Sequence, residues 1–155
     1  MKVYRIAKWQ YLEDLSGVGA KLYGGRWNEE GTAMVYTSAH LSLAVLELLA
    51  NQVRRLVDDT YGYICIEIPD AIPLRSINKD DLSSDWRAAQ YTDQTTRMGT
   101  QWIKLQESLG LMVPSAVLAQ EYNVLINPSH RDFDQLIIKE VGKLNLDGRI
   151  AATSE

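Results

Sequence analysis

Short apolar runs and longer stretches of mixed polarity follow one another along the chain, and they predict two kinds of secondary structure. Runs rich in β-branched and aromatic residues predict six strands, at residues 3–7, 34–38, 61–68, 113–119, 123–126 and 135–141. Two longer helical stretches separate some of these runs. Because strands and helices do not alternate regularly, the pattern favours an α+β fold, with a mixed or antiparallel sheet and flanking helices, over a doubly wound parallel sheet.

The first helical stretch is expected at residues 41–57, where apolar residues occupy most sides of the helix. Ser38 is expected to cap its start, and Arg54 and Arg55 would lie near the negative end of its dipole. Glu47 is the one charged residue in the apolar part, and a buried carboxylate is costly unless it is paired. Its role is therefore either structural, in an ion pair or at a solvent-facing edge, or functional, in a pocket between helix and sheet.

The second helical stretch, residues 84–109, is expected to be broken into shorter pieces. Thr92 can cap a new helical start within it, and Gly99 weakens the middle of the stretch. Gly110 follows directly and is expected to end the helix, because glycine readily adopts the left-handed conformation found at helix ends.

The composition indicates one domain in a reducing compartment. We expect residues 1–155 to form a single domain, with an ordered core from about 3 to 150 and a short C-terminal tail. The single cysteine, Cys65, lies in an apolar run and cannot form an internal disulfide.

The chain shows neither a signal peptide nor a stretch of about 20 apolar residues, so we expect a cytoplasmic protein without a membrane span. The net charge of -4 argues against direct contact with nucleic acid.

The segment Gly24-Gly25-Arg26-Trp27-Asn28 is a candidate anion-binding site. Two glycines let the backbone turn or approach a ligand closely, and the guanidinium of Arg26 matches phosphate or carboxylate oxygens. A glycine turn with a solvated arginine and a buried tryptophan is the alternative. Gly17 and Gly19 do not form a dinucleotide-binding fingerprint, because Leu22 occupies the third glycine position, and the phosphate loop of nucleotide kinases is absent too.

Further polar side chains lie in or beside the predicted strands. The ring of Tyr36, just before the first helix, is either a core tyrosine or a surface that stacks on a flat heterocycle. Ser115 lies in an apolar pattern, so its hydroxyl needs a buried partner from the protein or from a ligand. Asn127, before Pro128, is typical of a turn. The histidine spacing does not support a zinc site, and the motif of a serine hydrolase is absent.

Taken in order, these motifs resemble the RES domain family, the toxins of RES–Xre toxin–antitoxin pairs, named for an arginine, a glutamate and a serine. The resemblance covers nearly the whole chain. It runs through Tyr4-Arg5, Gly24-Gly25-Arg26-Trp27-Asn28, Val35-Tyr36-Thr37-Ser38, Leu43-Ala44-Val45-Leu46-Glu47, Trp86, Gly99-Thr100-Gln101-Trp102, Val113-Pro114-Ser115-Ala116 and Asn123-Val124-Leu125-Ile126-Asn127-Pro128-Ser129-His130.

The resemblance implies a fold similar to diphtheria-toxin-like ADP-ribosyltransferases and an activity that consumes NAD as substrate, without a metal. Arg26, Glu47 and Tyr36 match the arginine, the glutamate and the pocket tyrosine of the family. Ser115 is taken as the family serine, with Ser129 as the competing candidate. The residues expected to contact NAD are Arg26, Trp27, Asn28, Tyr36, Ser115 and Asn127.

The chemistry of these side chains is compatible with cleavage of the nicotinamide–ribose bond. That cleavage builds positive charge on the ribose, which the carboxylate of Glu47 could stabilise. Arg26 could pair with the diphosphate, Tyr36 could pack on the nicotinamide ring, and Ser115 could hydrogen-bond the ribose or the amide. Nicotinamide leaves as a neutral molecule, so a strong general acid is not required.

Three functions are therefore considered. In the first, the protein is a growth-inhibiting toxin that transfers ADP-ribose to water and depletes cellular NAD, as a glycohydrolase. In the second, a protein side chain accepts the ADP-ribose, and in the third the domain binds without catalysis. The resemblance also implies a partner, an Xre-type helix-turn-helix antitoxin that blocks the active site in a hetero-oligomeric complex and makes the DNA contacts.

Overall fold

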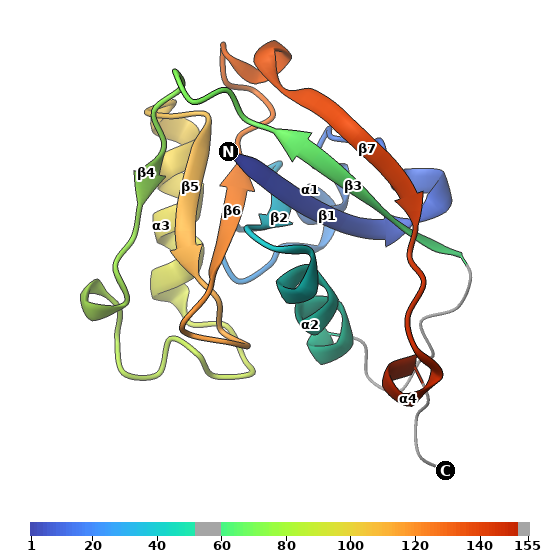
Figure 1. Ribbon diagram of the computed structural model, residues 1–155. Helices are drawn as coiled ribbons and strands as arrows, with labels where there is room; N and C mark the ends of the chain where they lie inside the picture. The colour runs from blue at the N-terminus through green and yellow to red at the C-terminus, as the bar shows by residue number, and fades with distance from the viewer. Residues whose placement is uncertain (52–59, 152–155) are drawn as a thin grey trace.

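The computed structural model describes residues 1–51 and 60–151, which form one sheet with helices on its two faces (Figure 1). The described strands are β1 (Lys2–Lys8), β2 (Val35–Ser38), β3 (Tyr61–Glu67), β4 (Arg75–Ser76), β5 (Gly110–Pro114), β6 (Tyr122–Ile126) and β7 (Ile137–Lys143). They lie in the order β4-β5-β6-β2-β1-β3-β7. All neighbouring pairs are antiparallel except β4 and β5, which are parallel. The prediction of an α+β fold with a mixed sheet is confirmed.

The helices differ in length and in what they cover. They are α1 (Val18–Tyr23), α2 (Leu41–Asn51), α3 (Asp93–Leu105) and α4 (Gly148–Ala151), with short 3-10 turns at Trp9–Tyr11, Lys79–Asp81 and Phe133–Gln135. In Figure 1, α3 lies behind β5, and α2 lies below β1 and β2, against which it packs. Among the described residues, no helix is long and apolar enough to cross a membrane.

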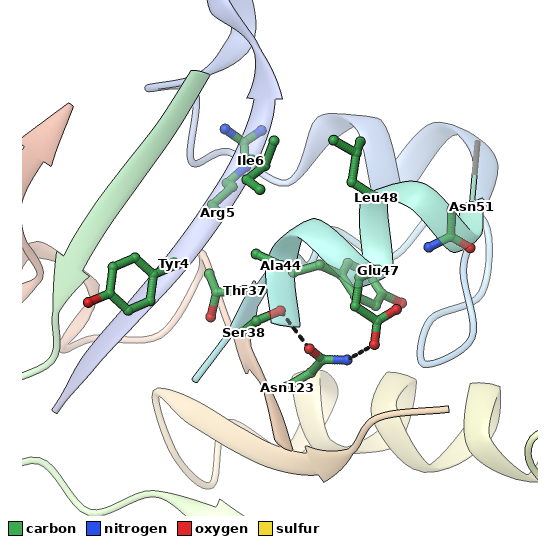
Figure 2. A pocket seen from close by; sticks show the side chains of 11 residues that line it. Tyr4, Arg5, Ile6, Thr37, Ser38, Ala44, Glu47, Leu48, Asn51 and Asn123 are labelled. Carbon is green, nitrogen blue, oxygen red and sulfur yellow. Dashed lines mark hydrogen bonds between the residues drawn. The ribbon is translucent and has the colours of Figure 1, made fainter. Parts of the chain in front are cut away.

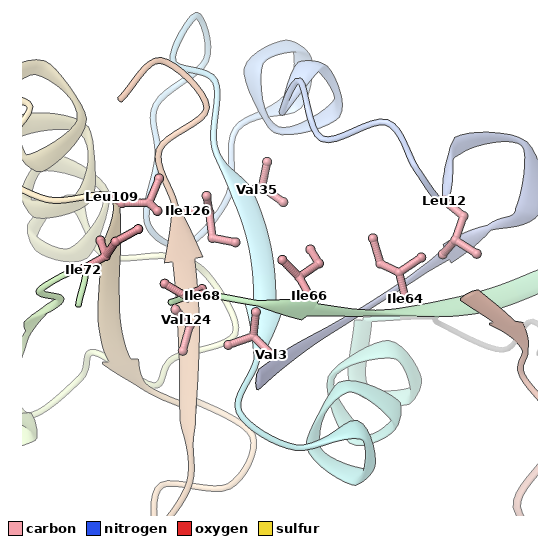
Figure 3. Packing of buried hydrophobic residues seen from close by; sticks show 10 residues of the cluster. All are labelled: Val3, Leu12, Val35, Ile64, Ile66, Ile68, Ile72, Leu109, Val124 and Ile126. Carbon is pink, nitrogen blue, oxygen red and sulfur yellow. The ribbon is translucent and has the colours of Figure 1, made fainter. Parts of the chain in front are cut away.

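The sheet separates two hydrophobic clusters, and strand alternation assigns each residue to one of them. Val124 and Ile126 of β6 point into the first cluster, together with Val3 of β1 and residues of β3, as Figure 3 shows. Leu125, between them, points to the opposite face and joins the second cluster. There Trp102 of α3 packs with Trp27 and Trp86, so this face is filled by large aromatic side chains. The side chains of β2 and β6 therefore pack against hydrophobic residues on both faces of the sheet.

The predicted strands all overlap observed ones, but the expectation for residues 113–119 was largely wrong. There β5 ends at Pro114, and the chain turns immediately afterwards. The turn forms because the Ser115 hydroxyl accepts hydrogen bonds from the backbone N–H groups of Val117 and Leu118. The helix α1 and the two-residue strand β4 were not predicted from the sequence.

The start of α2 differs from the prediction. Ser38 does not cap this helix: it is the last residue of β2, and its hydroxyl donates to Asn123 instead. The helix begins at Leu41, after two residues of bend. Residues 52–57, with Arg54 and Arg55, lie outside the described residues.

The break within the second helical stretch is present, with α3 beginning just after Thr92. Thr92 occupies the N-cap position, although its side chain makes no capping hydrogen bond. The helix ends at Leu105 rather than at Gly110, because Gln106 adopts the left-handed conformation at φ 53°. Gly99 has a packing role: a Cβ atom there would lie 1.8 Å from the carbonyl oxygen of Trp27.

Candidate active site

Glu47 is held by two side chains that come from other parts of the sheet. It follows the buried residues Leu43 and Ala44 on α2 by about one helical turn, so it lies on the side of the helix that faces the sheet. Its Oε1 accepts hydrogen bonds from the hydroxyl of Ser115 at 2.7 Å and from Nδ2 of Asn123 at 2.6 Å. Figure 2 shows the second of these bonds. Among the residues that the structure describes, nothing donates a hydrogen bond to Oε2.

Two adjoining cavities open in front of this carboxylate, with volumes of about 320 Å³ and about 230 Å³. Both are lined by Tyr36, Glu47, Asn51 and Asn123, so they are two parts of one depression. Arg5 and Tyr4 of β1 line the larger part, and Arg26 and Tyr91 line the smaller part. A carboxylate, aromatic rings and two guanidinium groups therefore surround a common space.

The turn that carries Arg26 depends on its two glycines. Gly24 has a φ of 66°, in the left-handed region that favours glycine. At Gly25, a Cβ atom would lie 2.7 Å from the hydroxyl oxygen of Tyr36. Both glycines are thus required by the backbone, the first by its conformation and the second by the close approach of the tyrosine.

Arg26 connects this turn to the loop that precedes α3. Its Nη1 donates to the carbonyl oxygen of Trp86 at 2.6 Å, and its Nη2 donates to that of Ala88 at 3.0 Å. The guanidinium carbon lies 5.1 Å from the ring centroid of Tyr91, within cation–π distance. Burial lowers the pKa of Arg26, and Tyr91 and Glu47 oppose this shift. The guanidinium remains charged and is fixed at the cavity wall.

Tyr36 supplies one wall of both cavities and also supports the glycine turn. Its hydroxyl accepts a hydrogen bond from the backbone N–H of Trp27 at 3.1 Å and donates to Oδ1 of Asn28 at 2.7 Å. Burial of the phenol raises its pKa far above the usual value, so the hydroxyl stays protonated at neutral pH. The ring is therefore oriented from its polar end.

Trp27 and Asn28 have mainly structural positions. Trp27 is buried in the second hydrophobic cluster, although part of it reaches the smaller cavity. The side-chain amide of Asn28 is 1% exposed and donates to the backbone carbonyl groups of Ala20 and Thr32. The expected contact of Asn28 with NAD has no support in this geometry, because its polar atoms are occupied within the loop.

The structure separates the two candidate serines. Ser115 lies beside Glu47, fully buried, and its hydroxyl donates to the carboxylate while it accepts two backbone N–H groups. These three contacts take up the hydrogen-bonding capacity of the Ser115 hydroxyl, so in this geometry it holds Glu47, and its expected direct contact with NAD stays a prediction. The hydroxyl of Ser129 instead donates to Oδ1 of Asn127.

Asn127 also lies away from the cavity. It directly follows the end of β6, whereas Asn123 lies near the start of that strand. The side chain is fully buried, and its amide donates to the carbonyl oxygen of Ile103 at 3.3 Å. Its Oδ1 accepts from both the backbone and the side chain of Ser129. In this geometry Asn127 closes the connection between β6 and α3, and its expected contact with NAD stays a prediction without support from its position.

Arg5, Asn51, Tyr91 and Asn123 line the cavity and were not assigned to it by the sequence analysis. Arg5 donates from Nη1 to the carbonyl oxygens of Tyr11 and Leu12, and burial lowers the pKa of its guanidinium. For two of these four residues the sequence contained a feature that could have assigned them to the site. Arg5 belongs to the N-terminal Tyr-Arg motif, and Asn123 is a polar residue at the start of an apolar strand.

The described residues contain no group of three histidine, cysteine or acidic side chains that could hold a metal ion. Both histidines pair with carboxylates. His40 lies 2.7 Å from Glu121 at the surface, and His130, which is buried, lies 3.6 Å from Asp132.

The chain is similar to one protein family and to several proteins named as toxins. The family model of the RES domain matches residues 2–147. A protein named Toxin Res from Photorhabdus laumondii is 38% identical over 138 residues, which are 88% of each chain. Another Toxin Res, from Yersinia enterocolitica, is 37% identical over 86% of this chain and 88% of its own. A protein named Prs ADP-ribosylating toxin, from a Sphingobium species, is 34% identical over 89% of this chain and 87% of its own.

The fold has a match among solved structures. The crystal structure of the M. tuberculosis MbcT–MbcA toxin–antitoxin complex contains a chain that superposes with a TM-score of 0.73. The match covers 92% of this chain and 83% of that one, at 18% sequence identity, so it establishes the similarity of fold alone.

Proposed function

Because the chain belongs to the RES domain family, we propose that it is the toxin of a toxin–antitoxin pair and that it cleaves NAD at the nicotinamide–ribose bond. The observation that carries this proposal is the position of Glu47. Its carboxylate is held through one oxygen, while the other faces no protein donor among the described residues, in a cavity also lined by Tyr36 and Arg26.

Glu47 has the chemistry that the bond cleavage needs. As the bond to nicotinamide breaks, positive charge develops on the ribose ring, and a fixed carboxylate nearby stabilises that charge without reorganising. Both donors to Glu47 bind the same oxygen, Oε1. The negative charge on Oε2 is therefore available to the ribose.

Two arginines provide the positive charge for the diphosphate. Arg26 uses one N–H of each terminal nitrogen to hold the loop before α3, and the remaining N–H groups of its planar fork can bind phosphate oxygens. Arg5 lies in the larger part of the cavity and has its Nη1 fixed by two carbonyl groups. An extended dinucleotide could then place its anionic centre between them, with the ribose at Glu47.

Tyr36 supports recognition of the leaving group. Its ring lines both parts of the cavity, and its hydroxyl is already engaged by Trp27 and Asn28. What the ring offers to a ligand is thus its aromatic face, which suits stacking on a flat heterocycle such as nicotinamide. Stacking of this kind adds about 0.5–1.5 kcal/mol beyond the burial of area.

The direct test is release of nicotinamide by the purified protein incubated with NAD. We expect Glu47→Gln to lower turnover by at least about 10²-fold, because a neutral amide no longer stabilises the developing charge. Glu13→Gln, a substitution of an exposed glutamate, serves as the matched control and should retain activity. Undiminished turnover by Glu47→Gln would remove this carboxylate from the mechanism. A wild-type protein that never releases nicotinamide would support a non-catalytic binding module instead.

The acceptor of ADP-ribose defines a second candidate function. Water as acceptor makes the protein a glycohydrolase that depletes NAD. A protein side chain as acceptor is favoured by one observation, the similarity to the Sphingobium protein named Prs ADP-ribosylating toxin. Free ADP-ribose formed without protein labelling supports the glycohydrolase, whereas stoichiometric labelling of one protein supports the transferase.

The proposed partner is an antitoxin that covers the cavity. The similarity of fold to a chain from a toxin–antitoxin complex supports such a partner, and the RES–Xre resemblance suggests one with a helix-turn-helix domain. Co-expression with a candidate antitoxin of this kind should restore growth and allow purification of a stable complex. The complex should not release nicotinamide from NAD, and full activity of the complex would contradict a blocked cavity.

A further inference from the structure

Asn123 makes a hydrogen bond to Glu47 that the sequence analysis did not anticipate. Its Nδ2 donates to Oε1 of Glu47 at 2.6 Å, across a separation of 76 residues in the chain. Asn123 is the second residue of the apolar strand β6, after the exposed Tyr122, and it lines both parts of the cavity.

Ser38 determines which way the Asn123 amide faces. The Ser38 hydroxyl is 2.7 Å from Oδ1 of Asn123, and the two residues are paired in register between β2 and β6. With Oδ1 accepting from Ser38, the NH₂ group must point to Glu47, as Figure 2 shows. Without Ser38 the carbonyl oxygen of this amide loses its donor, and the bond to Glu47 is the remaining side-chain hydrogen bond among the described residues that orients the amide.

We propose that Ser38 and Asn123 form a positioning relay that fixes the Glu47 carboxylate with its outer oxygen toward the ribose. This inference rests on the proposed function, and it assigns the two residues a role that acts only through Glu47. Ser115 holds the same oxygen from the turn directly after β5, so Glu47 is fixed by one donor from β6 and one from the residue that follows the neighbouring strand. The position of the carboxylate then follows from the sheet and not from α2 alone.

The relay makes a specific kinetic prediction. Asn123→Ala should lower kcat roughly 10²-fold with little change in KM, because a misplaced carboxylate affects the transition state more than substrate binding. Asn123→Asp, which has nearly the same shape, should be at least as impaired, because it places an acceptor where Glu47 needs a donor. Ser38→Ala should show a smaller loss of kcat.

The double variant separates a relay from two independent structural effects. Because Ser38 acts only by orienting Asn123, Ser38→Ala combined with Asn123→Ala should match Asn123→Ala alone within about twofold. Losses that multiply would overturn the relay. Ser108→Ala is the stability control. It removes a buried hydroxyl that bonds Trp102 and the carbonyl oxygen of Gly110, so it should lower the Tm without changing kcat.

A crystal structure of Asn123→Ala tests the positioning without using activity. The relay predicts that the Glu47 carboxylate leaves its position or becomes disordered, and a carboxylate that stays in place would overturn the relay. If the wild type cleaves NAD and Asn123→Ala is unimpaired, the relay fails and the proposed function stands. If the wild type does not cleave NAD, the proposed function fails, and the structure of the variant still decides whether Asn123 positions Glu47.

Discussion

Arg26 donates a hydrogen bond to the carbonyl oxygen of Trp86, 60 residues later in the chain, at 2.6 Å. A second bond, to the carbonyl oxygen of Ala88, uses the other terminal nitrogen of the same guanidinium. The side chain that we propose as a diphosphate ligand therefore also shapes the wall of its own cavity. Replacement of Arg26 should therefore change both the binding of the diphosphate and the shape of the cavity wall.

Arg26→Lys should raise KM for NAD by at least about tenfold. A lysine keeps the charge, but its compact ammonium group has three donors instead of the five of the planar guanidinium fork, so it cannot reproduce the spacing between the two carbonyl groups and the phosphate. A charge-assisted bond contributes about 1.5–3 kcal/mol. Steady-state kinetics of nicotinamide release measures the effect. Arg97→Lys, on the exposed surface of α3, is the matched control. Equal KM values for both variants would show that the guanidinium fork is dispensable.

Gly99→Ala should destabilise the fold. The added Cβ would lie 1.8 Å from the carbonyl oxygen of Trp27, so α3 or the glycine turn must move, at a cost of about 1–3 kcal/mol in the free energy of unfolding. Gly19→Ala, where the new Cβ would have no atom within 4 Å beyond its chain neighbours and the backbone of its own helix, should stabilise α1 by about 0.5–1 kcal/mol. Urea denaturation of the two variants provides the comparison, and similar midpoints would contradict the close approach.

Tyr36→Phe should change how stability depends on pH. Burial raises the pKa of Tyr36 above its usual value of 10.0, so the unfolded chain loses this proton at a lower pH than the folded chain. The contribution of Tyr36 to stability is thus complete below that usual value and is lost as the pH rises beyond it.

The phenylalanine variant lacks both that contribution and the hydrogen bonds to Trp27 and Asn28. It should be less stable than the wild type by about 1–2 kcal/mol at neutral pH, and the gap should narrow above about pH 10. Denaturation at several alkaline pH values measures this gap. Tyr23→Phe, which alters an exposed ring, should follow the wild-type curve, and a gap that stays constant with pH would contradict the burial effect.

Ser115→Ala and Ser129→Ala should have opposite outcomes for activity. Removal of the Ser115 hydroxyl takes a donor from Glu47 and an acceptor from the N–H groups of Val117 and Leu118, so we expect a loss in kcat of roughly 10²-fold. Ser129→Ala removes a contact with Asn127, away from the cavity, and should keep kcat. Nicotinamide release by both variants decides between the two serines, and the reverse result would identify Ser129 as the functional one.

The elements defined by local pattern could be predicted from the sequence. The apolar strand Tyr61–Glu67 and the start of α3 after Thr92 follow from residue type and spacing within a few positions. The end of β5 could not be predicted in this way, because it depends on hydrogen bonds from the next backbone N–H groups to the Ser115 hydroxyl, which form a turn. A side chain that hydrogen-bonds the nearby backbone can end a strand, and the pattern of apolar and polar residues gives little sign of it.

The residues that line the candidate site were easier to predict than the hydrogen bonds between them. Arg26, Tyr36 and Glu47 do line one cavity, as the motifs suggested. Asn123 lies near the start of β6 and Asn127 directly follows its end, and nothing in their local sequence shows which of them contacts Glu47. The choice depends on contacts between segments that are distant in the chain, which local chemistry does not encode.

The hydroxyl of Ser115 has a further consequence for chemical probes. Its proton is committed to Glu47, and both lone pairs are committed to backbone N–H groups. Acylating or phosphonylating reagents that trap nucleophilic serines therefore meet an oxygen with no free electron pair, beneath a surface that leaves it 0% exposed. Such reagents should therefore leave Ser115 unmodified, and a cationic group matched to the open oxygen of Glu47 is the better starting point for an inhibitor.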